Sequence, residues 1–118
     1  MELSKQVVSL ELAKKLKELG VKQKSLFYWT PDGKLRYGFK QFIDNKGKAI
    51  WSISAFTVAE LGEICRKKKD FDEPFPHLGA DGWYYYTGDN SVPKKAKTEA
   101  NARAKMFIYL IESKLLKP

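Results

Sequence analysis

The stretch that decides the fold is TEANARAKMFIYLIESKLLK, which runs from Thr98 to Lys117. Thr98 is a favourable N-cap residue, and Glu99 stands in the first turn, where the helix dipole stabilises negative charge. At 100° per residue, one stripe of the helix is apolar. It consists of Ala100, Ala104, Phe107, Ile108, Ile111 and Leu115. Because such a stripe must be covered, we predict a helix over residues 98–116 around which the rest of the chain packs.

The same helix is apolar beyond its stripe. Met106, Tyr109 and Leu110 lie away from it, so the run MFIYLI is apolar nearly all the way round, and such a helix is normally covered on more than one side. We expect the first predicted helix, with Leu12, Leu16 and Leu19, to lie alongside and supply the cover, and the protein to be a monomer. The alternative is that Met106 and Tyr109 form the centre of a surface for a partner or for self-association as a homodimer.

A first helix is predicted over residues 9–19, after a short lead-in over residues 1–8. Ser9 is its N-cap, and Gly20 suits the C′ position that ends a helix. Its apolar face carries Leu12, Leu16 and Leu19. The charged residues on the opposite face are expected to be solvated.

A second helix is predicted over residues 57–67. Thr57 followed by Glu60 is a capping box, and Phe56 can pack against Leu61 as a hydrophobic staple. The inner stripe of this helix consists of Val58, Leu61, Ile64 and Cys65. The residues that we expect to share one core are Leu16, Leu61, Phe107 and Ile111.

Aromatic residues and turn signals between these two helices indicate strands. LFYWT (26–30) is followed by a turn at 30–33, and the alternation of Leu35, Tyr37 and Phe39 with polar residues predicts a second strand. Phe42 breaks this alternation, which indicates a bulge or bend near Lys40 or Gln41. After a turn at 44–47, AIWSIS (49–54) completes a predicted antiparallel meander.

The segment before the last helix contains one clear strand signal. Pro74, Pro76, Gly79 and Gly82 predict a loop over residues 70–82. The aromatic run 83–86 predicts a strand, and residues 91–97 are predicted to be a basic connection. The whole chain is therefore expected to be a single α+β domain over residues 1–118. We expect an antiparallel sheet of three to four strands with three helices mostly on one face.

The charge composition limits the classes of partner. Lysine and arginine number 22 against 14 aspartate and glutamate residues, a net charge of +8. Nucleic acid, an acidic protein surface and anionic lipid all remain compatible with this charge. One cysteine excludes a disulfide within the chain and suits a reducing compartment, and no run has the length of a membrane span or signal peptide. We expect a cytoplasmic protein without membrane contact.

Residue types suited to catalysis or metal binding are scarce. One histidine and one cysteine cannot form the ligand set of a zinc site. We expect Cys65 to be a buried apolar residue, and His77 to be a packing or surface residue of its loop. The acidic cluster Asp70, Asp72 and Glu73 is expected to be solvated rather than to work as an acid–base pair. We therefore predict no enzymatic activity, cofactor, metal or small-molecule substrate.

Aromatic residues beside basic ones are the main functional signal. Alternate residues of a strand lie on opposite faces, and helices can cover only one face of a sheet, so some aromatic residues are expected to be exposed. Such residues suit a protein interface or the stacking of single-stranded nucleic acid. Packing within a thin two-sided sheet is the alternative. The residues that we expect to form a partner surface are Trp29, Arg36, Lys40, Lys48, Tyr84 and Tyr86.

Three stretches resemble a known family when taken together. VSLELAKKLKELGVKQKSLFYW (8–29), AFTVAELGE (55–63) and TEANARAKMFIYLIE (98–112) are similar, in this order, to small phage- and prophage-type bacterial proteins. The variable parts fall in residues 31–50 and 66–97. The resemblance implies an accessory protein of a mobile element rather than a housekeeping enzyme. It assigns no role to any residue, because that family has no established activity, ligand or site.

These observations favour a small non-enzymatic accessory protein that binds a host or phage macromolecule, with a protein as the expected partner. The alternative is a nucleic-acid-binding module that uses the basic surface and the strand aromatics. Phosphate-mediated binding weakens steeply with salt, which would distinguish the two.

Overall fold

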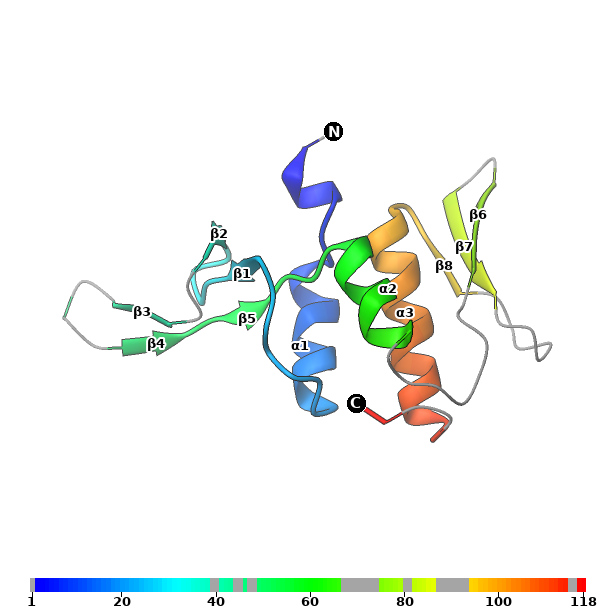
Figure 1. Cartoon of the computed structure of the whole chain (residues 1–118). Helices are drawn as coiled ribbons and strands as arrows, with labels where there is room; N and C mark the ends of the chain where they lie inside the picture. Colours follow the sequence, from blue (N-terminus) through cyan, green and yellow to red (C-terminus); the bar gives the residue numbers. More distant parts are fainter. Residues whose placement is uncertain are drawn as a thin grey trace.

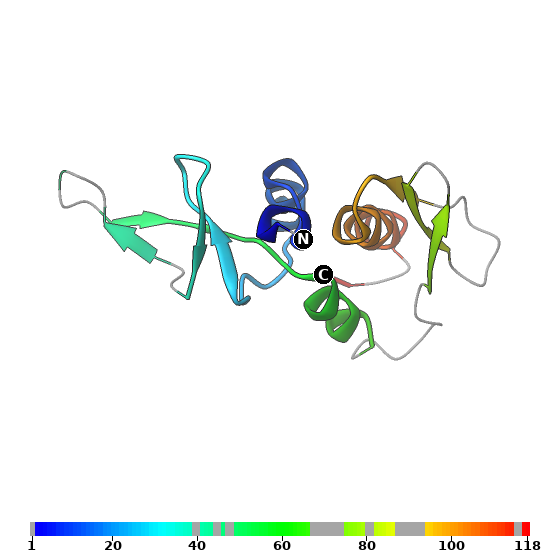
Figure 2. The ribbon, with the colours of Figure 1, turned by 90° about the horizontal axis from the view of Figure 1, so that it is seen from above.

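The computed structural model describes residues 2–38, 41–43, 46, 49–66, 75–79, 82–86, 94–114 and 117–118. Within them the chain has an α+β fold of helices and antiparallel strands, as predicted. The three α-helices lie together in the middle of the molecule, and strands lie on both sides of them (Figures 1 and 2). The molecule is therefore elongated, with extents of 51 × 31 × 18 Å.

The helices are α1 (Leu10–Glu18), α2 (Val58–Arg66) and α3 (Glu99–Glu112), and a 3-10 turn, η1 (Leu3–Lys5), precedes them. The predicted caps are confirmed. Thr98 Oγ1 accepts a hydrogen bond from the Asn101 N–H at 3.2 Å. In the capping box, the Thr57 N–H donates to Glu60 Oε1 at 3.0 Å and the Glu60 N–H donates to Thr57 Oγ1 at 3.2 Å. All three helices begin toward the top of the view in Figure 1, so they run in the same direction across the middle of the molecule.

The predicted helix ends are confirmed at α1 and differ at α3. Gly20 has a φ of 92°, which favours glycine, and its N–H donates to the Lys17 carbonyl at 3.0 Å while the Val21 N–H donates to the Leu16 carbonyl at 3.1 Å. This pair of bonds is a Schellman motif. Helix α3 ends at Glu112, earlier than predicted, and Lys114 takes a φ of 60°. Leu115 lies outside the described residues.

The first sheet has the order β2-β1-β5, formed by β1 (Phe27–Trp29), β2 (Leu35–Tyr37) and β5 (Ile53–Ser54). A separate hairpin is formed by β3 (Gln41–Ile43) and β4 (Ala49–Trp51), and it projects away from the helices (Figures 1 and 2). The predicted meander is therefore wrong in its connectivity. The 49–54 run divides at Ser52, so its first half pairs with β3 and its second half with β1. Gly38, with a φ of 102°, follows β2 and turns the chain out of this sheet. Most of the predicted bulge and the second turn lie outside the described residues.

The second sheet has the order β6-β7-β8, formed by β6 (Phe75–Gly79), β7 (Gly82–Tyr86) and β8 (Lys94–Ala96). Strand β7 confirms the predicted strand. The predicted loop is wrong over 75–79 and the predicted basic connection is wrong over 94–96, so His77 lies in a strand. Pro76 is tolerated because β6 is an edge strand, and lysines are common on edges such as β8.

The core surrounds α3. As predicted, Leu16, Leu61, Phe107 and Ile111 belong to one buried cluster. Met106 and Leu110 are buried as well, so α3 is covered within the chain. Helix α1 supplies only part of the cover, since α2 and strands β7 and β8 also pack on α3.

The first residues are more than a lead-in. Val7 and Val8 are fully buried, Val7 forms an isolated bridge with Thr57, and the Val8 N–H donates to the Phe56 carbonyl at 2.9 Å. This short segment ties the start of α1 to the start of α2.

Candidate binding surfaces

The predicted partner residues do not come together. Trp29 and Arg36 belong to the first sheet, whereas Tyr84 and Tyr86 belong to β7, on the other side of the helices (Figures 1 and 2). Lys40, Lys48 and the side chain of Tyr86 lie outside the described residues. The expected single surface therefore divides into two regions.

Trp29 has a structural role rather than a free stacking face. Its Nε1–H donates to the Val8 carbonyl at 2.9 Å, and its half-buried ring packs against the core. The neighbouring Tyr28 is 5% exposed, and its hydroxyl accepts a hydrogen bond from the Ser25 N–H at 3.2 Å. For these two residues, packing within the fold accounts for the aromatic character of β1.

Tyr37 is the exposed aromatic residue of the first sheet. Its side chain is 71% exposed, and its ring meets that of Phe27 edge-on, with centroids 5.6 Å apart and an interplanar angle of 63°. Lys34 and Arg36 on either side of Leu35 are exposed. Phe27 and Tyr37 are paired across the sheet and share one face, whereas Arg36 lies on the opposite face of β2. We call Phe27 and Tyr37, together with Lys34 and Arg36 on the same edge of the sheet, the Tyr37 surface. The sequence did not single out Tyr37; the available signal was its place at the end of a strand, before Gly38.

The turn that precedes the Tyr37 surface is held by a carboxylate. The Thr30 hydroxyl donates to Asp32 Oδ1, and the Lys34 N–H lies 3.4 Å from the same oxygen. The hydrogen bond from Thr30 lowers the pKa of Asp32 below its usual value, with smaller contributions from the backbone and charge of Lys34. The turn therefore carries a stable negative charge that is already engaged with its own backbone.

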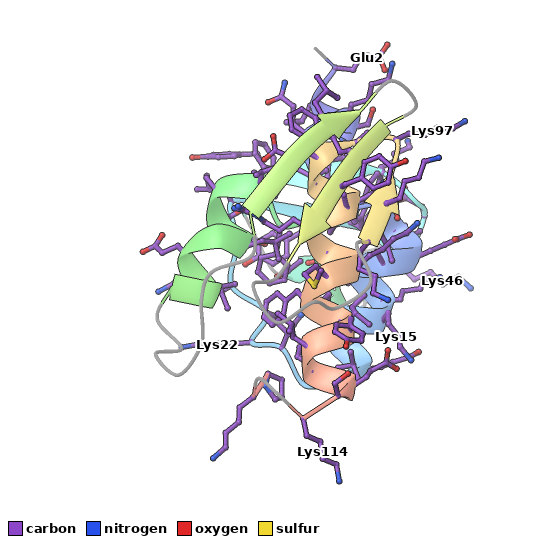
Figure 3. The ribbon with its side chains drawn as sticks, turned by 90° about the vertical axis from the view of Figure 1, so that its right-hand side faces the viewer. Glu2, Lys15, Lys22, Lys46, Lys97 and Lys114 are labelled. Atoms are coloured by element: carbon purple, nitrogen blue, oxygen red, sulfur yellow. The ribbon has the colours of Figure 1, made fainter. Side chains whose placement is uncertain are left out.

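The second region lies on the sheet β6-β7-β8. Lys95 Nζ lies 5.8 Å from the centroid of the Tyr84 ring, and Lys105 Nζ donates to the Lys95 carbonyl at 2.9 Å. Lys97 follows β8 and points away from the body of the molecule (Figure 3). We call Tyr84, Lys95, Lys97 and Lys105 the lysine surface. The half-buried ring of Tyr84 lies close to Gly79 on the neighbouring strand β6. A Cβ added at Gly79 would come 2.9 Å from Tyr84 Cε2.

Two cavities lie elsewhere in the described part of the chain. One of about 620 Å³ is bordered by Lys22, Lys24, Leu26 and Glu63. It also contains Glu60, whose Oε2 accepts from the Leu26 N–H at 3.0 Å, so this carboxylate is used to hold the fold. Its mixed charges do not favour one class of ligand.

The other cavity, of about 410 Å³, lies between the first turns of α2 and α3. Lys5, Lys97 and Trp83 border it together with Thr57 and Thr98. Both threonine hydroxyls accept hydrogen bonds from helix N–H groups as caps, so both already take part in holding the helix ends.

No three His, Cys, Asp or Glu residues of the described chain form a group that could hold a metal ion. No helix among the described residues is long and apolar enough to cross a membrane. Comparisons with protein-family models, curated proteins and solved structures found no match to this chain. The Tyr37 surface and the lysine surface are therefore the features from which a function can be inferred.

Proposed function

We propose that this chain is a non-enzymatic interaction protein that binds a partner protein through the Tyr37 surface. The observation that carries the proposal is Tyr37 itself, which is 71% exposed and rests edge-on against Phe27. Tyrosine and arginine are enriched among the residues that dominate binding energy at interfaces. A ring with a defined packing partner loses little conformational entropy when it is buried by a second protein.

The charges of the surface indicate the chemistry of the partner. Lys34 and Arg36 are exposed on the segment that carries Tyr37, with Arg36 on the opposite face of β2, and the whole chain carries a net charge of +8. Complementary charge speeds encounter and suppresses wrong partners. We therefore expect an acidic surface on the partner. The resemblance to phage- and prophage-type proteins makes a host or phage protein the partner class to examine first.

Site-specific photo-crosslinking tests the proposal in cells that carry the gene. A photoreactive amino acid in place of Tyr37 is expected to give a discrete adduct with one protein. The matched control position is Leu78, which is 62% exposed in the second sheet. Equal adducts from both positions would show general surface adhesion and contradict the proposal.

The purified partner then allows the contribution of Tyr37 to be measured. Tyr37→Ala is expected to weaken binding at least about tenfold, equivalent to about 1.4 kcal/mol, while Tyr37→Phe changes it little. The thermal midpoint should hardly change, because most of the side chain is already in solvent. Unchanged affinity of the alanine variant would contradict the proposal.

A second candidate function is the binding of single-stranded nucleic acid at the lysine surface. It is favoured by the approach of Lys95 Nζ to the Tyr84 ring, which places a cation beside an aromatic face. Fluorescence polarisation of labelled single-stranded and duplex oligonucleotides over a salt series tests it. Binding must weaken with salt and with Tyr84→Ala or Lys97→Gln, and Lys22→Gln is the control. Binding that is independent of salt, or of these residues, would exclude this candidate.

A further inference from the structure

The edge strands of the two three-stranded sheets differ in whether other groups of the chain block them. An edge strand presents unpaired N–H and C=O groups that can pair with another chain, and native proteins commonly block them. In the first sheet the edge strands are β2 and β5, and in the second they are β6 and β8. Three of these edges carry a visible block.

The edge of β5 is blocked by a side-chain amide. The ladder to β1 includes a hydrogen bond from the Ala55 N–H to the Phe27 carbonyl, so the intervening Ser54 N–H points away from β1. That N–H donates to Gln23 Oε1 at 2.8 Å, and Gln23 Nε2 in turn donates to the Val21 carbonyl at 3.0 Å. Gln23 therefore takes the place that another strand would occupy.

The second sheet is blocked on both sides. On β8, the Lys95 carbonyl accepts a hydrogen bond from Lys105 Nζ at 2.9 Å. On β6, Pro76 has no N–H to offer to another strand. Each block comes from a different element, which indicates that edge pairing is disfavoured at these places.

Strand β2 differs from the other edges. The Thr30 N–H donates to the Lys34 carbonyl at 2.8 Å, and the Gly38 N–H donates to the Leu26 carbonyl at 3.0 Å. Hydrogen-bonded and non-hydrogen-bonded pairs alternate in an antiparallel ladder. The pair Tyr28–Arg36 lies halfway between these two bonded pairs, so it is hydrogen-bonded as well. The N–H and C=O groups of Leu35 and Tyr37 consequently point away from β1. No described side chain bonds to them.

We infer that the β2 edge receives an extended acidic segment of the partner protein as an additional antiparallel strand. This inference rests on the proposed function and specifies how the Tyr37 surface would be used. Main-chain hydrogen bonds to Leu35 and Tyr37 give such a complex its affinity, and side chains on alternate positions give specificity. Lys34, which directly precedes β2, and Arg36 within it are both exposed and complement carboxylates on the added segment.

Charge also argues against a second copy of this chain as the occupant. A symmetric antiparallel pairing that bonds Leu35 of one copy to Tyr37 of the other places the two Arg36 residues directly opposite each other. Like charges in opposite positions destabilise a strand pair. The same arginine that repels a second copy attracts an acidic strand.

The test begins with a random peptide library displayed against the full chain. Enriched peptides are expected to be acidic at alternating positions, and one such synthetic peptide becomes the probe. On adding it, the amides of Leu35 and Tyr37 should gain hydrogen-exchange protection, whereas the amide of Arg36 is already bonded to β1. Only every second amide of the bound peptide would point toward β2. N-methylation of that set of amides should weaken binding at least tenfold, whereas N-methylation of the other set should hardly change it.

Two variants separate backbone pairing from charge. Leu35→Pro removes an outward N–H while leaving the bonds to β1 in place, and Arg36→Glu reverses a charge without touching the backbone. Both variants are expected to bind the peptide probe at least tenfold more weakly, with Lys22→Glu as the charge control. Unchanged exchange protection at Tyr28 verifies that β1 and β2 stay paired in each variant. Arg36→Glu and the N-methylated peptides carry the test if Leu35→Pro fails to fold.

The outcomes distinguish this inference from the proposed function. Failure to enrich acidic peptides, or binding without protection at Leu35 and Tyr37, overturns the inference. If Tyr37→Ala lowers the affinity for the natural partner while Leu35→Pro does not, side chains bind the partner, and only the inferred strand pairing is wrong. If Tyr37→Ala leaves the natural partner unaffected, the proposed function is wrong as well.

Discussion

The two three-stranded sheets flank the same helices, yet they differ in how they are attached to the helices and in how their edge strands are blocked. Each contributes one tryptophan to the core, Trp29 from the first sheet and Trp83 from the second. The first sheet is further tied down by hydrogen bonds from Trp29 to the Val8 carbonyl and from the Leu26 N–H to Glu60. The second is attached mainly through β7 and β8, which pack on α3.

The difference in their edges indicates a difference in role. Pro76 and Lys105 protect the two edges of the second sheet, and Gln23 protects one edge of the first. The β2 edge is left beside the exposed Tyr37. Among the described residues no group bonds to the outward N–H and C=O groups of β2, which is why the proposed strand addition is assigned to this edge and not to the second sheet.

The largest expected effect tests whether both sheets depend on one core. Phe107 is fully buried in α3, so Phe107→Ala should lower the free energy of unfolding by about 3–5 kcal/mol. Chemical denaturation measures the loss, and hydrogen exchange should show β1 and β7 losing protection together. Leu78→Ala, at a position 62% exposed, is the control and should change stability by less than about 0.5 kcal/mol. A loss confined to one sheet would contradict a shared core.

A smaller effect should be confined to the second sheet. Gly82 has a φ of 145°, and an added Cβ would lie 2.7 Å from the Ala96 carbonyl oxygen. Gly82→Ala is therefore expected to cost about 1–3 kcal/mol through backbone strain and to loosen β7 from β8. Gly33→Ala is the matched control, since Gly33 has a φ of 80° but nothing within 4 Å of the added carbon. Equal costs at the two glycines would mean that the contact with Ala96 relaxes freely.

The helices could be predicted from the sequence because their signals are local. Thr57 and Glu60 lie three residues apart and cap each other, and Gly20 ends α1 through bonds to the preceding turn. The strands β6 and β8 were missed because proline and lysine disfavour central strands, while an edge strand tolerates both. Which strands pair is decided by contacts between residues far apart in sequence, so the return of β5 to β1 had no local signal.

The candidate surfaces were only partly predictable for the same reason. Trp29 was expected at a partner surface, but its indole bonds to Val8, 21 positions away. Arg36 is exposed as expected, and Tyr84 has a lysine beside its ring. The open edge of β2 and the blocking of β5 by Gln23 depend on a ladder register that no single stretch of sequence specifies.

Gln23 offers a direct way to sharpen the comparison of the edges. Gln23→Ala removes the acceptor of the Ser54 N–H, so stability should fall by about 1 kcal/mol. The Ser54 amide should exchange faster, while the amides of Leu35 and Tyr37 keep their rates. Gln23→Glu is the conservative control, since a carboxylate can still accept from Ser54 although it cannot donate to Val21. An unchanged Ser54 rate in the alanine variant would show that Gln23 does not block the edge.

The smallest expected effect concerns the turn that aligns β2 with β1. The Thr30 hydroxyl lowers the pKa of Asp32 in the folded state, so the ionised carboxylate favours folding. Such a contribution is fully present above the unfolded-state pKa and is lost as the pH falls through the lower folded-state pKa. Asp32→Asn should therefore lower stability slightly at neutral pH, and this difference should vanish in acid, once the pH has fallen below the lowered pKa of Asp32.

Denaturant midpoints of the two proteins at neutral and acidic pH measure this difference. Glu18→Gln, at an exposed position of α1, controls for the loss of one negative charge. Because Asp32 is fully exposed, solvent screens most of its interaction, which places this effect below that of Gln23. A difference that persists unchanged in acid would mean that the amide disturbs the turn itself. Stability near β2 would then depend on the shape of the turn rather than on the charge of Asp32.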